Sequence, residues 1–395
     1  MYQGRVLKIL RIFFIVFLIT GTFFHGLVYA EDENNFEAKF TFTVTPARNT
    51  TATYFKLSAA GTFYVDWGDG NTQTITRTNT NQASYTHRYT STTSRTIKLG
   101  GVATAYSTGS EESDAAISFA DNTYITGISG SLGRLFPTLS NGSQPLFKAT
   151  FAENTNLAGT IPGELFDGIT GQPRDEMFRS LFWNDKKLTG SIPGELFSGL
   201  YGTPTENLFY GVFYYCSGLT GSIPGELFSG IAGNQQERLF QNTFNYCSKL
   251  SSFIPPELFA GINKTPAVTG TNGAFTNVFA NTTNMLTSCP SGYQKYTTGF
   301  ESYFNNRVSC ELSLTCPNGQ GRYDGACYNL CSFGTKLMVD TGLSFDVFGE
   351  LEPSSNPKLY IKLNNTTCYV FTKSGTGTFN FEYTDGKTYH LVGIN

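Results

Sequence analysis

Cysteine carries the clearest chemical pattern in this 395-residue sequence. Six of the eight cysteines fall in the C-terminal third of the chain, at Cys289, Cys310, Cys316, Cys327, Cys331 and Cys368. Their spacing lacks the paired C-x₂-C arrangement of a zinc site. In an exported chain such a set predicts disulfides. We expect Cys289 to pair with Cys310, Cys316 with Cys327, and Cys331 with Cys368, which is one of many connectivities that six cysteines allow.

Residues that could catalyse a reaction are scarce. The three histidines His25, His87 and His390 are far apart in the sequence, and His25 falls in a segment that is expected to be removed. The sequence has no G-x-S-x-G, H-E-x-x-H or Walker motif. Because so few groups could transfer a proton or hold a transition metal, we predict a protein that is not an enzyme, with no catalytic residue, metal or cofactor.

Two sets of carboxylates have alternative interpretations. Asp66 and Asp69 could bind Ca²⁺, but this ion prefers about six to eight oxygen ligands and no further acids lie nearby, so a structural turn is favoured. One glutamate recurs along the chain and could be considered catalytic, at Glu164, Glu195, Glu226 and Glu257. An acid in the first turn of a helix is better explained by its favourable interaction with the helix dipole.

The N-terminal segment and the overall charge indicate the compartment. Arg5, Lys8 and Arg11 precede an apolar run, and Val28 and Ala30 place small residues before a cleavage point. This pattern predicts a signal peptide over residues 1–30, cleaved after Ala30, with an uncleaved anchor as the alternative. No later segment is long enough to span a membrane, so the mature chain is expected to be secreted or at the cell surface. A formal net charge of −3 gives no indication of nucleic-acid binding.

A repeat with a step of 31 residues dominates the middle of the sequence. Ile-Pro pairs begin at Ile161, Ile192, Ile223 and Ile254. The same step separates Leu157, Leu188, Leu219 and Leu250, and also Phe166, Phe197, Phe228 and Phe259. Pairs of phenylalanines begin at Phe147, Phe178, Phe209 and Phe240. The next pair begins at Phe275 after 35 residues, so we expect the loop at 263–273 to carry four extra residues.

Each repeat predicts a short strand followed by two short helices. Residues 219–223 alternate apolar and small polar side chains, as a strand does, and Pro224 prevents the strand from continuing. Residues 225–231 indicate a helical turn that glycine ends, and Phe240 with Phe244 predicts a second helix. Stacked units would form a solenoid over residues 109–286, with a parallel sheet on one face and helices on the other. A degenerate unit near Ile125 and a truncated one at 275–285 are expected to cap it.

The strings F-Y-Y-C-S-G-L-T at 213–220 and F-N-Y-C-S-K-L-S at 244–251 resemble the F-x-x-C-x-x-L-x core of BspA-type leucine-rich repeats of bacterial surface proteins. The run L-T-G-S-I-P-G-E-L-F also resembles plant-type repeats, and the resemblance covers residues 121–286. It implies an α/β leucine-rich-repeat solenoid with a buried ladder at Asn154, Asp185, Cys216 and Cys247. We expect the two cysteines to be buried free thiols. A disulfide is the alternative, because neighbouring strands lie about 4.8 Å apart.

Modules rich in β-structure are expected on both sides of the solenoid. Alternating residues at 36–45 and 62–66, the string W-G-D-G at 67–70, Y-T-H-R-Y at 85–89 and a strand at 95–99 resemble a PKD-type β-sandwich, assigned to 31–108. In this module His87 is expected to be a strand residue. A cysteine-rich segment is assigned to 287–331 and a small antiparallel β domain to 332–395, with strands at 359–363, 368–372, 378–383 and 388–392.

The candidate ligand-binding surface is the outer face of the predicted parallel sheet. Its outward positions are Ala158 and the candidate binding residues Thr160, Thr189, Ser191, Thr220, Ser222, Ser251 and Phe253. Small hydroxyl side chains suit a protein or glycan on a host or neighbouring cell better than a phosphate-rich partner. We predict a monomeric adhesion protein. The alternatives are a structural spacer or surface-layer element without a specific ligand and, less favoured, a secreted enzyme.

Overall fold

The computed structural model describes residues 36–291 and 293–312, together with four strand segments at 320–323, 326–329, 358–363 and 367–372. The expected signal peptide and its cleavage point lie outside the described residues. So do Cys316, Cys331 and the strands expected at 378–383 and 388–392. In the described part of the chain no helix has the length and apolar content needed to cross a bilayer.

The N-terminal part forms two antiparallel sheets, as the alternating sequence pattern predicts. One sheet has the strand order β4-β3-β6-β1-β8, and the other has the order β5-β2-β7. A single 3-10 turn, η1 (Glu112–Asp114), precedes β7. The strands are β1 (Phe40–Val44), β2 (Thr51–Leu57), β3 (Ala59–Asp66), β4 (Thr72–Arg77), β5 (Ala83–Arg88), β6 (Arg95–Tyr106), β7 (Ile117–Ser118) and β8 (Ile125–Gly130).

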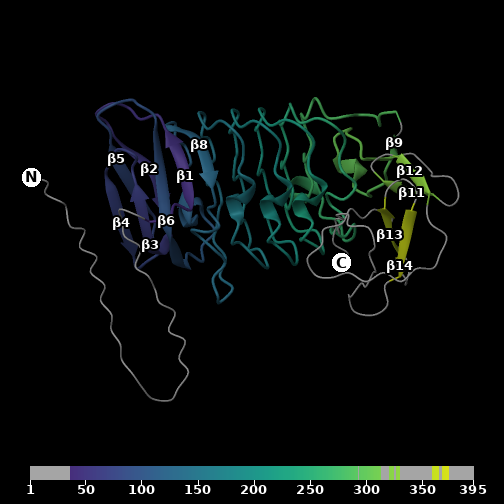
Figure 1. Cartoon of the computed structure of the whole chain (residues 1–395), viewed down its shortest axis with the longest axis horizontal. Coiled ribbons are helices and arrows are strands. Elements are labelled where there is room, and N and C mark those ends of the chain that lie inside the picture. Colours follow the sequence, from purple (N-terminus) through teal and green to yellow (C-terminus); the bar gives the residue numbers. More distant parts are fainter. Residues whose placement is uncertain are drawn as a thin grey trace, which may run out of the picture.

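The middle of the chain is a stack of coils that lie side by side (Figure 1). Three coils carry a 3-10 helix directly after the Ile-Pro pair, namely η2 (Gly163–Phe166), η3 (Gly194–Phe197) and η4 (Gly225–Phe228). The 31-residue step therefore repeats in space, and the first helical turn expected in each unit is confirmed as a 3-10 turn in three of the four units. The extra residues near 263–273 form a loop that includes η5 (Gly270–Asn272).

The second helix expected in each unit is absent, and the described residues contain no α-helix. Around Phe178 the backbone alternates between two kinds of hydrogen bond. The Phe178 N–H donates to Leu208 O of the next coil, whereas the Leu181 N–H donates to Phe178 O within a turn. Every fourth residue has a positive φ, as at Glu176, Ser180 and Asn184. Phenylalanines four apart thus mark stacked four-residue turns instead of an α-helix, because half of the backbone donors bond between coils.

The expected parallel sheet is likewise reduced to isolated bridges. Positive φ values of 86°, 76° and 80° at Gly159, Gly190 and Gly221 interrupt the extended backbone, and proline follows three residues later. Single parallel bridges remain on two lines along the stack, at Gly159–Leu188 and Gly221–Leu250, and at Gly171–Leu200, Gly202–Ile231 and Gly233–Ile262. The α/β assignment is therefore wrong for the described residues, which form a mostly-β structure with a repeated 3-10 turn.

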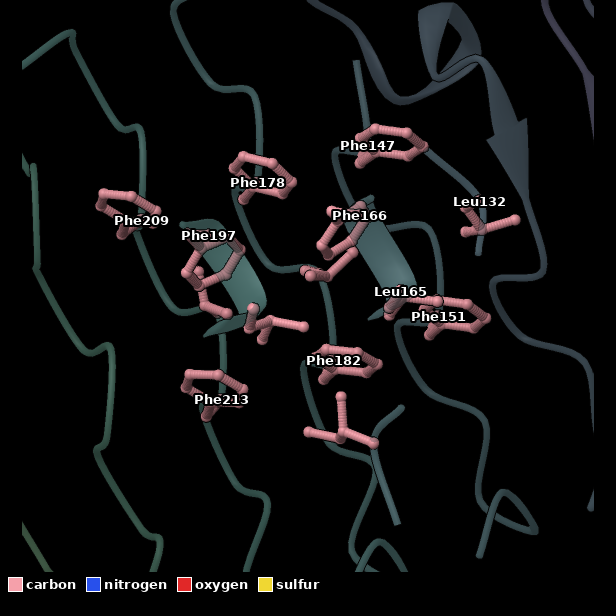
Figure 2. Packing of buried hydrophobic residues seen from close by; sticks show 14 of the residues in the cluster. Leu132, Phe147, Phe151, Leu165, Phe166, Phe178, Phe182, Phe197, Phe209 and Phe213 are labelled. Atoms are coloured by element: carbon pink, nitrogen blue, oxygen red, sulfur yellow. The ribbon is translucent and has the colours of Figure 1, made fainter. Parts of the chain in front are cut away.

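Stacked phenylalanine rings fill the centre of the array (Figure 2). The centroids of Phe151 and Phe182 are 5.2 Å apart, and those of Phe182 and Phe213 are 6.0 Å apart, with rings almost parallel. The same column continues into the N-terminal sheets, because Phe119 stacks on Phe151 at 5.3 Å and contacts Phe42 at 5.0 Å. One hydrophobic core therefore runs through the N-terminal sheets and the coils. Burying each ring in it contributes about 3 kcal/mol.

The C-terminal end of the stack is closed by residues 300–309. Phe300 packs on Phe275, and Phe304 packs on Phe279. The Ile254 N–H donates to Val308 O, and the hydroxyl of Ser309 donates to Ile254 O at 2.8 Å. This segment covers the hydrogen-bonding groups and rings that the last coil would otherwise leave exposed, as the cap of a repeat array must.

A disulfide joins Cys289 to Cys310, with the Cα atoms 5.7 Å apart, so the first expected pairing is confirmed. Cys310 opens β10 (Cys310–Leu312), which pairs with β9 (Tyr293–Lys295), and η6 (Glu301–Tyr303) lies between these strands. Two further antiparallel pairs join β11 (Gln320–Tyr323) to β12 (Ala326–Asn329) and β13 (Lys358–Leu363) to β14 (Thr367–Thr372). The strands expected at 359–363 and 368–372 are confirmed. The other two disulfides fall outside what the structure describes.

Candidate binding face

The candidate ligand-binding residues lie on one exposed edge of the coil stack, which we call the hydroxyl face. It consists of the six exposed residues Thr160, Thr189, Ser191, Thr220, Ser222 and Ser251. Phe253 differs, because its half-buried ring packs against Tyr293 of β9 with the centroids 5.2 Å apart. The repeat thus places the hydroxyl side chains together, and the C-terminal segment covers part of the one large apolar member.

The backbone beneath the hydroxyl face is held by hydrogen bonds between coils. The N–H groups of Thr189, Thr220 and Ser251 donate to the carbonyls of Gly159, Gly190 and Gly221 at 2.8, 2.9 and 2.9 Å. In each coil a leucine precedes the hydroxyl-face residues and an isoleucine follows them, and both side chains are buried in the core. The leucines are Leu157, Leu188, Leu219 and Leu250, and the isoleucines are Ile161, Ile192, Ile223 and Ile254. Because both neighbours are fixed, the hydroxyl side chains leave each coil from the same two positions.

A buried polar ladder lies just before the hydroxyl face in each coil. The Asn154 N–H donates to Oδ1 of Asp185 at 2.8 Å, and the Asn122 N–H donates to Oδ1 of Asn154 at 3.1 Å. The thiols of Cys216 and Cys247 donate to the carbonyls of Phe182 and Phe213 at 2.9 and 3.0 Å. Both cysteines are buried free thiols, as predicted. Burial raises the pKa of each thiol, which keeps it protonated as a donor.

Asp185 is the exceptional member of this ladder. Its side chain is fully buried, and Oδ2 has no hydrogen-bond partner. The corresponding side chain in the preceding coil, Asn154, uses Nδ2 to donate to Phe151 O at 2.6 Å. Burial is the main cause of the raised pKa of Asp185, and the charge of Glu153 adds to it against the opposing hydrogen bond from Asn154. The raised pKa favours the protonated form of Asp185, which avoids a buried charge on an oxygen without a partner.

The recurrent glutamates have a packing role. They are exposed and lie in the first turn of the 3-10 helices at Glu164, Glu195 and Glu226, as the sequence suggests. The carboxylate of Glu195 fills the space beside Gly163, where a Cβ would lie 2.1 Å from Oε1. Glu226 fills the same space beside Gly194. Glu257 lies beside Gly225, and the last Ile-Pro unit has Pro256 in place of the glycine.

In the turn of the N-terminal sheets, the carboxylates of Asp66 and Asp69 bond to other residues of the chain. Oδ1 of Asp66 accepts the Gly68 N–H at 2.9 Å, and its Oδ2 pairs with Lys98. Oδ1 of Asp69 accepts a hydrogen bond from the side-chain amide of Asn71, and Oδ2 accepts one from His87 at 2.8 Å. Burial opposes ionisation of Asp69, but the hydrogen bonds from His87 and Asn71 outweigh it and lower the pKa. His87 lies in β5, as expected. No group of three or more metal-ligating side chains occurs within the described ranges.

A second surface feature went unnoticed in the sequence. Tyr215 and Tyr246 occupy the same position of successive coils, with ring centroids 4.2 Å apart and an interplanar angle of 11°. Tyr214 lies against Tyr215 at 4.5 Å, and the Lys186 ammonium lies 5.7 Å from the centroid of the Tyr215 ring. In the sequence a tyrosine recurs directly before each ladder cysteine, and this recurrence is the local signal for the stack.

Comparisons of this chain with protein-family models, with curated proteins and with solved structures find no match.

Proposed function

We propose that this protein is an exported bacterial surface or secreted protein that mediates adhesion by binding a protein or glycan through the hydroxyl face. The proposal assigns the coils to the BspA-type leucine-rich repeats and the N-terminal sheets to the PKD-type modules that they resemble in sequence. It places a monomeric, cleaved chain outside the cell, with a partner on a host or neighbouring cell surface and with no bound nucleic acid, metal or cofactor.

One observation carries this proposal: adjacent coils present the same small hydroxyl side chains at the same place. Thr189, Thr220 and Ser251 are exposed, and their backbone N–H groups are bonded to the preceding coil. A hydroxyl group both donates and accepts hydrogen bonds, so a periodic row can match the carbonyls, amides and hydroxyls of a peptide or a sugar. A rigid row loses little conformational freedom on binding, which favours affinity.

Substitution of the hydroxyl face tests the proposal directly. In the double variant Thr189→Arg and Thr220→Arg, two long charged side chains would cover the centre of the face. We expect binding of the exported protein to cells or to a glycan array to be lost, with the thermal unfolding midpoint unchanged. The matched control is Ser198→Arg with Ser229→Arg, which changes exposed residues further along the same two coils. If the first variant binds as well as the wild type, or if neither protein binds any surface component, the spacer interpretation replaces adhesion.

A further inference from the structure

The tyrosines before the ladder form a surface that the hydroxyl face does not include. We call the six residues Tyr214, Tyr215, Tyr246, Lys186, Lys187 and Lys249 the aromatic–lysine strip. Tyr246 is 38% exposed, while Tyr214 and Tyr215 are half-buried. The neighbouring hydroxyl of Tyr215 raises the pKa of Tyr246. The tyrosines of the strip precede the buried ladder residue in their coils, and its lysines lie between the ladder residue and the hydroxyl face.

The backbone at these tyrosines is strained. Tyr215 and Tyr246 have φ values of 64° and 61°, in the left-handed region that bulky residues rarely adopt. The equivalent residues in the coils on either side are Asn184 and Asn281, with φ values of 67° and 58°. Asparagine accepts this conformation at lower cost than tyrosine does. Tyrosine at this position thus carries a conformational cost that the stack imposes and that asparagine would reduce.

The charge beside the rings is positive and uncompensated. Lys186, Lys187 and Lys249 are all exposed, and none forms an ion pair with any described residue. Lys187 donates to Oδ1 of Asn156 at 2.6 Å, so its charge is hydrogen-bonded but not neutralised. Two acids occupy this part of the repeat: the buried Asp185, and Glu153, which takes the position of Asn184 one coil earlier. Lys186 lies beside the Tyr215 ring, and Lys187 and Lys249 follow Asn184 and Tyr246, residues of the same column, by three positions. These cations favour an anionic partner, although the whole chain carries a net charge of −3.

We propose that the aromatic–lysine strip binds an acidic saccharide, in which a carboxylate-bearing pyranose packs against the exposed Tyr246 ring at the end of the tyrosine stack and its carboxylate pairs with the lysines. The face of an aromatic ring is negative and attracts the C–H groups of a sugar face. Phenol hydroxyls and the amide of Asn281 can bond to the sugar hydroxyls. An acidic peptide offers the carboxylate but no rigid apolar face of this size. This inference goes beyond the proposed function, because it concerns other residues and names the chemistry of the partner.

The test is titration calorimetry of the exported protein with a tetrameric oligogalacturonide and with its methyl ester, which lacks the charge. We expect binding of the acid and at least about tenfold weaker binding of the ester. Tyr246→Ala and Lys186→Ala should each weaken binding about three- to tenfold. Tyr201→Ala is the matched control, since Tyr201 is 65% exposed but lies outside the strip.

Other outcomes overturn the inference. Equal binding of the acid and its ester removes the role of the lysines, and failure of both to bind removes the saccharide site. If Tyr246→Ala lowers the unfolding midpoint while the acid binds as before, the tyrosines serve only to stack the coils. The hydroxyl-face variant, Thr189→Arg with Thr220→Arg, should bind the oligogalacturonide normally, so that failure of either proposal can be recognised separately.

Discussion

Replacing Asp185 with asparagine should stabilise the protein at neutral pH. Asp185 is fully buried, its Oδ2 has no partner, and its pKa is raised well above 3.8, chiefly by burial. The groups that face it are Asn154, whose N–H donates to it, the thiol of Cys216, and the charge of Glu153. Asparagine keeps the acceptor for Asn154 and adds a permanent donor, as Asn154 itself does in its own coil.

The sign of the pH dependence follows from the direction of the pKa shift. Below pH 3.8 the side chain is protonated in both the folded and the unfolded state, so it imposes no penalty. As the pH rises, the unfolded chain releases the proton while the folded chain keeps it. The free energy of unfolding then falls by about 1.4 kcal/mol per pH unit until the folded-state pKa is reached. From about pH 4 to pH 7 this amounts to at most about 4 kcal/mol.

Urea unfolding of the wild type and of Asp185→Asn between about pH 4 and pH 8 measures this effect. The two free energies of unfolding should agree within about 1 kcal/mol at pH 4 and separate as the pH rises, with the variant more stable. The pH at which the curves become parallel gives the folded-state pKa. Asp167→Asn is the control, because Asp167 is an exposed acid in the neighbouring coil. Parallel curves for Asp185→Asn over the whole range would show that Asp185 is ionised in the fold and would refute the reasoning.

Three further predictions follow from contacts between coils and from the cysteines. Gly230→Ala should destabilise the array by about 2 kcal/mol or more, because a Cβ there would meet Leu200 O at 1.9 Å. Gly194→Ala should cost less than about 1 kcal/mol, because only the carboxylate end of the Glu226 side chain must shift. Equal unfolding midpoints for the two variants would contradict this packing. Cys289→Ser should lower stability by about 3 kcal/mol in denaturant unfolding by removing the link to Cys310, and a variant as stable as the wild type would contradict that contribution. Cys216 and Cys247 should resist a thiol reagent in the native protein and react once it is unfolded, as mass spectrometry can record; rapid labelling of the native protein would contradict their burial.

The sequence predicts the period of the array better than its backbone conformation. Ile, Leu and Phe at a constant step identify which residues enter the core, and the same spacing places Thr189 and Thr220 on the surface. Phenylalanines four apart, such as Phe178 and Phe182, fit both a helix and a stack of four-residue turns. Only the hydrogen bonds between coils distinguish these two structures, and such non-local bonds leave no local pattern in one unit.

Contacts between segments that are far apart in the sequence could not be predicted from local sequence patterns either. The contact of Phe253 with Tyr293 joins residues far apart in the sequence. The continuation of the ring stack from Phe151 through Phe119 into the N-terminal sheets depends on how β1 pairs with β8. The stacking of Tyr215 on Tyr246 follows from the repeat step, and the recurring tyrosine could have suggested it. Their positive φ values follow from the turn stack, which the helix interpretation excluded.

Successive coils stack directly on one another, and this stacking aligns the hydroxyl face. Spin labels at Ala158→Cys and Ser251→Cys, which occupy the same position three coils apart, test it by pulsed electron resonance. Ring separations of 5.2, 6.0 and 5.8 Å between the intervening coils predict backbones about 17 Å apart. The unlabelled chain, with Cys216 and Cys247 buried, is the background control. A narrow distribution near this distance, widened only by the label arms, supports the account. A broad distribution or a distance beyond about twice that value contradicts it, because stacked coils cannot be so far apart.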